Sequence, residues 1–182
     1  SMHSLPGTHN VTRHILKNGI TVLARENMTS PSVVVDASLH VGSTYEDRTH
    51  AGLANLTSAM LMRGTSNASF DQIHGRIEAV GASLDTSCGV HTGGFSGKAL
   101  AEDLDMLLET AADVVRNPTF PEDHVARLRG ETITGLAMRA HNTRAMAALT
   151  FYESLFGDDH PYGYPNDGYL DLSLIHISEP TR

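Results

Sequence analysis

The stretch that decides the fold is residues 51–65, which read Ala-Gly-Leu-Ala-Asn-Leu-Thr-Ser-Ala-Met-Leu-Met-Arg-Gly-Thr. Its apolar residues recur at helical spacing: Leu53, Leu56 and Met60. This spacing predicts an amphipathic helix. We expect Thr49 to cap its start and Gly64 to end it, because short hydroxyl side chains favour helix starts and glycine favours helix ends.

One face of this predicted helix carries Asn55, Ser58 and Ala59, because positions three and four apart share a face. The stretch resembles the signature helix of the pitrilysin/insulinase group of zinc peptidases, the inverzincins, which reads Gly-Leu-Ala-His-x-x-Glu-His-Met-Leu-x-x-Gly-Thr. In that family the two histidines bind zinc and the glutamate activates the metal-bound water. The flanking positions of the frame are kept here: Gly52, Leu53, Ala54, Met60, Leu61, Gly64 and Thr65.

The three chemical positions of that frame are replaced. Asn55 stands for the first histidine, Ser58 for the glutamate and Ala59 for the second histidine. A methyl group cannot ligate a metal, an amide is a weak neutral ligand, and a hydroxyl is a poor general base. The resemblance places the third zinc ligand, a glutamate in active relatives, at Gly135, with Glu131 one turn earlier as the open alternative. We therefore expect no catalytic residue, no metal and no cofactor, where active relatives hold zinc.

Further landmarks extend the resemblance over residues 12–169. They are Leu16-Lys17-Asn18-Gly19-Ile20, Val41-Gly42-Ser43 with Glu46, Ile77-Glu78-x-x-Gly81-Ala82, Asn117-Pro118-x-Phe120 and His160-Pro161-Tyr162-Gly163. In active relatives the strand after the third landmark lies at a sheet edge and pairs with the substrate backbone. By this likeness we expect an extended peptide to bind in the region 84–94, at Leu84, Asp85, Thr86 and Ser87.

The order of the predicted elements indicates an α+β fold. Strands are expected at residues 12–16 and 20–25, joined by Asn18-Gly19 as a hairpin, at 32–41, mostly buried, and at 82–87 and 90–99. Helices are expected at 70–80, opened by a capping box of Ser69 and Gln72, at 104–115, after Pro121, and at 143–156. We expect the helices to pack on a mainly antiparallel sheet, and the resemblance makes this a metallopeptidase-type (LuxS/MPP-like) domain. Many glycines near residues 89–97 predict bends or close backbone approach.

Composition narrows the class of function. The 182 residues are 40% apolar and 19% charged, as in an ordinary globular domain, and have a net charge of −8 without a basic run. Nucleic acid is therefore not expected as a partner, and no apolar run approaches the roughly 20 residues of a membrane span. Cys88 is the single cysteine, so we expect it to pack rather than to react. The start lacks the apolar core of a signal peptide, which leaves the bacterial cytoplasm or periplasm as the expected location.

The last eleven residues, 172–182, read Leu-Ser-Leu-Ile-His-Ile-Ser-Glu-Pro-Thr-Arg. One reading frame of a common transposase sequencing adaptor encodes this same string. We therefore treat residues 172–182 as an artefactual tail and residues 1–171 as one domain. The gene is then expected to continue, so that this chain is the front piece of a longer protein.

The resemblance implies a function without catalysis. Many members of the family work as two similar halves that enclose a chamber, with zinc in one half only. We expect this chain to be a degenerate half that binds peptide and completes the chamber of an active partner. Two alternatives stay open: a fragment of an active zinc metalloendopeptidase, and a scaffold that no longer handles peptides.

Overall fold

The computed structural model describes residues 10–170 of a chain that divides into two compact units, Ser1–Ser32 and Val33–Arg182. The described part of the first unit is a hairpin of β1 (Thr12–Ile15) and β2 (Thr21–Ala24), antiparallel from Thr12↔Ala24 to Ile15↔Thr21. This confirms the predicted hairpin. The expected artefactual tail, residues 172–182, lies outside the described residues.

The hairpin turn differs from the Asn-Gly turn that the sequence suggested. Gly19 has a φ of +90°, whereas Asn18 keeps a negative φ. Gly19 N donates to Leu16 O at 2.9 Å, and Leu16 N donates to Ile20 O at 2.8 Å. This is the pattern of a three-residue loop that ends in a glycine bulge, in which only the last residue needs the left-handed conformation.

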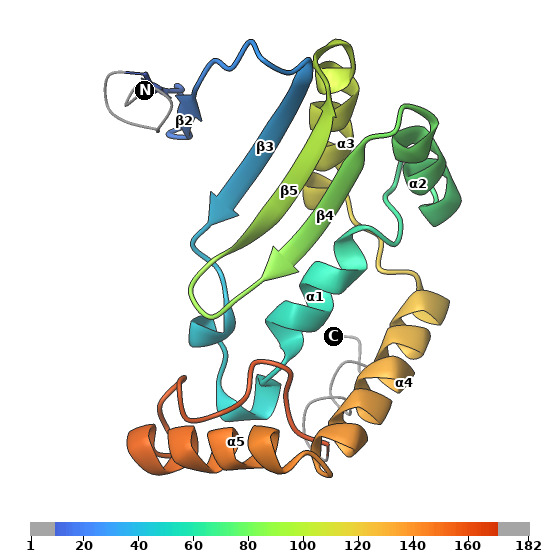
Figure 1. Cartoon of the computed structure of the whole chain (residues 1–182). Coiled ribbons are helices and arrows are strands. Elements are labelled where there is room, and N and C mark those ends of the chain that lie inside the picture. Colours follow the sequence, from blue (N-terminus) through green and yellow to red (C-terminus); the bar gives the residue numbers. More distant parts are fainter. Residues whose placement is uncertain (1–9, 171–182) are drawn as a thin grey trace. The chain divides into compact units, whose positions relative to one another are not determined.

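A three-stranded sheet forms the centre of the second unit. The order is β3 (Ser32–Leu39), β5 (Gly93–Leu100) and β4 (Ser83–Cys88), and β4 pairs antiparallel with β5 from Ser83↔Lys98 to Cys88↔Gly93. In Figure 1 the arrows of β3 and β4 point the same way and the arrow of β5 points the opposite way. The expected antiparallel sheet is confirmed.

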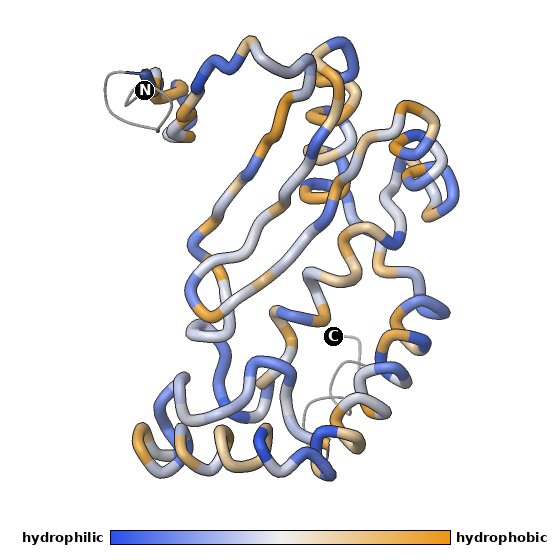
Figure 2. Tube along the Cα trace, viewed as in Figure 1, coloured by the Kyte–Doolittle hydropathy of each residue, from blue (hydrophilic) through white to orange (hydrophobic). Residues whose placement is uncertain are grey.

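The prediction that β3 is mostly buried was wrong. All eight of its residues are exposed or half-buried, and Val34 is 60% exposed. Figure 2 shows apolar colour in the first half of this strand. A run of valines is typical of a buried strand, but β3 lies at one end of the strand order, where less of it is covered.

Residues 10–170 form five α-helices, of which the first three contact the sheet: α1 (Leu53–Leu61), α2 (Phe70–Ala79), α3 (Leu104–Arg116), α4 (Glu122–Arg139) and α5 (Thr143–Phe156). Residues 10–170 also form three short 3₁₀ turns: η2 (Ser43–Tyr45), η3 (Arg48–His50) and η4 (Ala101–Asp103). The bounds of α2, α3 and α5 lie within one residue of those predicted, and α4 begins directly after Pro121 as predicted. No helix among residues 10–170 is long and apolar enough to cross a membrane.

The core lies where α3 and α2 pack against the strands β5 and β4. Leu107, Ala111 and Val114 of α3 are fully buried, as the helical spacing predicted, although Leu108 is 41% exposed. A Cβ placed at Gly97 would lie 3.0 Å from a methyl group of Leu107. The glycines of β5 therefore allow the close approach that the sequence suggested.

A polar junction fixes the segment between α1 and α2. Thr65 Oγ1 donates to Asp113 Oδ2 at 2.6 Å, and the amides of Asn67 and Asn117 donate to Asp113 Oδ1 at 2.6 and 2.8 Å. These hydrogen bonds, that of Thr65 first, lower the pKa of Asp113. The predicted capping box of α2 follows directly and is confirmed.

Candidate functional site

Glu46 caps the start of α1. The prediction that Thr49 caps it was wrong. Thr49 lies in η3, where the side chain of Asp47 accepts from its backbone N–H. One carboxylate oxygen of Glu46 accepts from Gly52 N at 3.1 Å and the other accepts from Ala54 N. Gly52 has a φ of +98°, which glycine adopts without strain. Glu46 is the acid of the Gly-Ser-x-x-Glu landmark, so this landmark has a structural role.

The helix also ends earlier than predicted. It stops at Leu61, and Gly64 lies three residues further on with a φ of +150°. There Gly64 forms an isolated bridge with Ser69, and Thr65 forms one with Pro118. These bridges redirect the backbone toward α2. The helix that bears the candidate site is thus nine residues long.

The three positions of the metal-binding frame fall on α1, as predicted, but they do not share one environment. Asn55 and Ala59 are exposed, whereas Ser58 is only 7% exposed. Thr86 Oγ1 of β4 donates to Ser58 O at 2.8 Å, so α1 lies along β4 (Figure 1). An amide, a buried hydroxyl and a methyl group do not provide the histidine and carboxylate ligands that zinc prefers. No group of three His, Cys, Asp or Glu that could hold a metal exists among residues 10–170.

The two candidate positions for a third ligand lie on α4, which contacts α1. Gly135 is exposed, and a Cβ placed there would meet no atom within 4 Å. Glu131 is engaged elsewhere, since its carboxylate accepts from Arg127 Nε at 2.9 Å on an exposed part of the helix. A ligand role for Glu131 would require this ion pair to open.

The strand β4, where a peptide was expected to bind, lies at one edge of the sheet. Its side chains alternate in burial: Leu84 is buried, Thr86 is half-buried, and Asp85 and Ser87 are exposed. Leu84 therefore offers only its backbone to a ligand, since its side chain belongs to the core. Beyond β4, no further strand pairs with this edge within residues 10–170.

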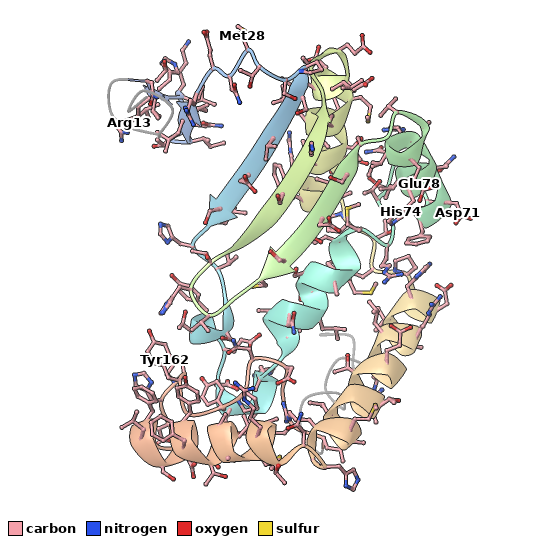
Figure 3. All side chains as sticks on the ribbon, viewed as in Figure 1. Arg13, Met28, Asp71, His74, Glu78 and Tyr162 are labelled. Carbon is pink, nitrogen blue, oxygen red and sulfur yellow. The ribbon has the colours of Figure 1, made fainter. Side chains whose placement is uncertain are left out.

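A cavity of about 730 Å³ opens beside the first turn of α1. Its wall combines α1, α5, the turn after β4 and the loop 158–168, and its residues include Asn55, His91, Leu149, Tyr152, Phe156, Tyr162 and Asn166. Tyr162 OH and His91 Nε2 lie 2.6 Å apart, and the rings of Phe156 and Tyr162 meet edge to face. Figure 3 shows Tyr162 at the C-terminal end of α5. The sequence marked its landmark His160-Pro161-Tyr162-Gly163 but did not place it beside α1.

Polar contacts hold the loop 158–168 against the start of α1. Tyr164 OH donates to the carbonyl oxygen of Glu46, and Ser43 Oγ donates to Asn166 Oδ1 at 2.7 Å. Burial raises the pKa of Tyr164, and the nearby carboxylates of Asp47 and Glu46 raise it further. Glu46 thus joins the loop, through its carbonyl, to α1, through its carboxylate.

The surroundings of Cys88 disfavour the reactive form of its thiol. Its thiol lies at the end of β4, where burial, and then the charge of Glu46, raises the pKa of the thiol. A raised pKa disfavours the thiolate, which is the nucleophilic form of cysteine. This agrees with the packing role expected from the sequence.

Comparison with known proteins places these features in a family. A family model described as insulinase, peptidase family M16, matches residues 21–155, which is most of the protein. The protein belongs to this family. An M16 peptidase inactive domain from Pseudomonas fluorescens has a similar structure, with a TM-score of 0.85 and 27% identity over 93% of this protein and 41% of that one. The predicted α+β metallopeptidase-type fold is therefore confirmed.

Curated relatives of this M16 protein include proteins named as uncharacterized zinc proteases. One from Rickettsia bellii is 28% identical over 150 residues, which are 82% of the present sequence and 36% of that protein. One from Mycobacterium tuberculosis is 30% identical over 170 residues, which are 93% of the present sequence and 38% of that protein. The beta subunit of the mitochondrial-processing peptidase of Rattus norvegicus is 31% identical over 115 residues, which are 63% of the present sequence and 23% of that subunit. The M16 sequence thus spans little more than a third of the length of the first two.

Proposed function

We propose that this M16 protein is a non-catalytic peptidase-family domain. It binds an extended peptide along the free edge of β4 and completes the chamber of an active zinc-peptidase partner of the same family. One observation carries the proposal: α1 keeps the family frame but presents Asn55, Ser58 and Ala59 where the frame has two metal ligands and a base. Substrate cleavage would then fall to the partner.

The geometry of β4 supports the peptide-binding part of the proposal. An edge strand offers unpaired backbone N–H and C=O groups to an added strand. The hydrogen bond from Thr86 to Ser58 O holds α1 beside this edge, and the cavity that Asn55 lines lies alongside α1. A peptide added to β4 would have the replaced positions as neighbours. Asp85, Thr86 and Ser87 would contact it, with Leu84 contributing through its backbone.

The similarity to a structure named as an M16 inactive domain supports the non-catalytic part. The similarity to the beta subunit of a mitochondrial-processing peptidase supports a partner of the same family. Nucleic acid has no place in this proposal, since the protein has a net charge of −8.

A peptide-binding experiment tests the proposal. We expect the isolated protein to bind a fluorescent extended peptide without cleaving it, both with and without a chelator. The matched control is the same peptide with N-methyl groups on alternate residues, which removes backbone donors while it keeps the side chains. Equal binding of the methylated peptide would contradict strand addition at β4.

The alternative is a fragment of an active zinc metalloendopeptidase, which the zinc protease names of the relatives favour. Chelator-sensitive cleavage by the isolated protein would establish it.

A metal titration separates the two functions further. We expect no tight zinc binding even by the variant Asn55→His/Ser58→Glu/Ala59→His, because Gly135 offers no third ligand. Adding Gly135→Glu, which has open space around its Cβ, should raise zinc affinity.

A further inference from the structure

The turn between β1 and β2 contains a chemically reactive pair. The sequence has eight asparagines, and Asn18 is the one followed by glycine. Both residues of the pair are exposed, and a Cβ placed at Gly19 would meet no atom within 4 Å. A backbone nitrogen can attack the preceding asparagine side chain most easily when its own residue has no Cβ, since a side chain there obstructs the approach.

We infer that Asn18 is a site of self-modification by deamidation, independent of the proposed peptide binding. The Gly19 nitrogen attacks Cγ of Asn18, forms an N–C bond and loses its proton to solvent. Nδ2 of Asn18 takes up a proton from solvent, the bond between Cγ and Nδ2 breaks, and ammonia leaves, which gives a five-membered succinimide. Water then opens the ring at either carbonyl and leaves aspartate or isoaspartate at this position. No oxidant or reductant takes part.

Three other asparagines, Asn67, Asn117 and Asn142, are less suited to this reaction because none of them is followed by glycine. The side-chain amide of Asn67 donates to Asp113 at 2.6 Å, and Asn142 Oδ1 accepts from Ala145 N at the start of α5. Asn117 precedes a proline, whose nitrogen bears no hydrogen. The Asn18 side chain also accepts a hydrogen bond, from Ile20 N at 3.2 Å, but the residue that follows it is an exposed glycine.

The folded turn slows the reaction without preventing it. Gly19 N–H donates to Leu16 O at 2.9 Å, so this hydrogen bond must open before the nitrogen can attack. All eight residues of β1 and β2 are exposed, and only four residue pairs join the strands. Exposed elements with few buried contacts open frequently in the native state. The modification adds a negative charge, and the isoaspartyl product also adds a methylene to the main chain at the turn that sets the strand register.

An incubation of the whole protein tests the inference. After incubation at 37 °C, we expect intact-mass spectra to show the gain in mass that accompanies replacement of –NH₂ by –OH. This gain should be faster at alkaline than at neutral pH. Tryptic mapping should place it in the peptide 18–25, and an isoaspartyl-specific methyltransferase should label that peptide. The variant Asn18→Gln should lose the gain entirely. An equal gain in mass by Asn18→Gln would overturn the inference. Deamidation of Asn18 in urea but not in buffer would also overturn it, because the folded turn would then protect Asn18.

Discussion

Replacing Glu46 by alanine is the sharpest test of how the candidate site is held together. The carboxylate of Glu46 accepts from the backbone of Gly52 and Ala54, and its carbonyl accepts from Tyr164. Glu46→Ala removes the first two hydrogen bonds and leaves the third possible. The first turn of α1, which contains Asn55, then has backbone donors without this partner.

The size of the effect follows from capping energetics. Loss of an N-cap costs about 0.5–2 kcal/mol, and hydrogen bonds to charged groups contribute about 1.5–3 kcal/mol. Because Glu46 is half-buried and water can replace part of the cap, we expect a loss of about 1–2 kcal/mol. Glu46→Gln keeps one acceptor oxygen and should lose about half as much.

Urea unfolding followed by circular dichroism measures this loss as a shift in midpoint at constant slope. Glu78→Ala is the matched control, since Glu78 is an exposed residue of α2 (labelled in Figure 3) and its loss should change stability by less than about 0.5 kcal/mol. Hydrogen exchange should also speed up at the amides of residues 52–55. If Glu46→Ala behaved like Glu78→Ala, Glu46 would not be the cap of α1.

Three further predictions concern the fold. Gly135→Ala should raise the free energy of unfolding by about 0.5–1 kcal/mol in urea titrations, whereas Gly94→Ala should lower it, because its Cβ would overlap the carbonyl oxygen of Ala37. Leu107→Ala should cost about 2–5 kcal/mol by calorimetry, since the side chain is fully buried, and a smaller loss would place it outside the core. The lowered pKa of Asp113 means that its contribution to stability is present above about pH 4 and is lost as the pH falls through the folded-state value. Urea midpoints of the parent protein should therefore fall more steeply below pH 4 than those of Asp113→Asn.

Local sequence signals determined most of the secondary structure. The capping box of Ser69 and Gln72 fixes the start of α2, because both partners lie within one turn of each other. The helical spacing of Leu107, Ala111 and Val114 likewise predicted the buried face of α3. The family frame around Asn55 placed the candidate site on α1, since matching residues at fixed spacing need no tertiary information.

Tertiary structure decided what those signals could not reach. The sequence alone placed Asn55, Ser58 and Ala59 at the three chemical positions of the family frame, because residue identity and spacing can be read directly from it. Only the folded protein showed that Glu46 caps α1 in place of Thr49, that β3 is exposed, and that the loop 158–168 closes a cavity beside Asn55. The physical reason is the distance along the sequence between the groups that interact. Capping boxes and helical faces depend on residues a few positions apart, whereas burial and the contact from Tyr164 to Glu46 join groups that only the complete packing brings together.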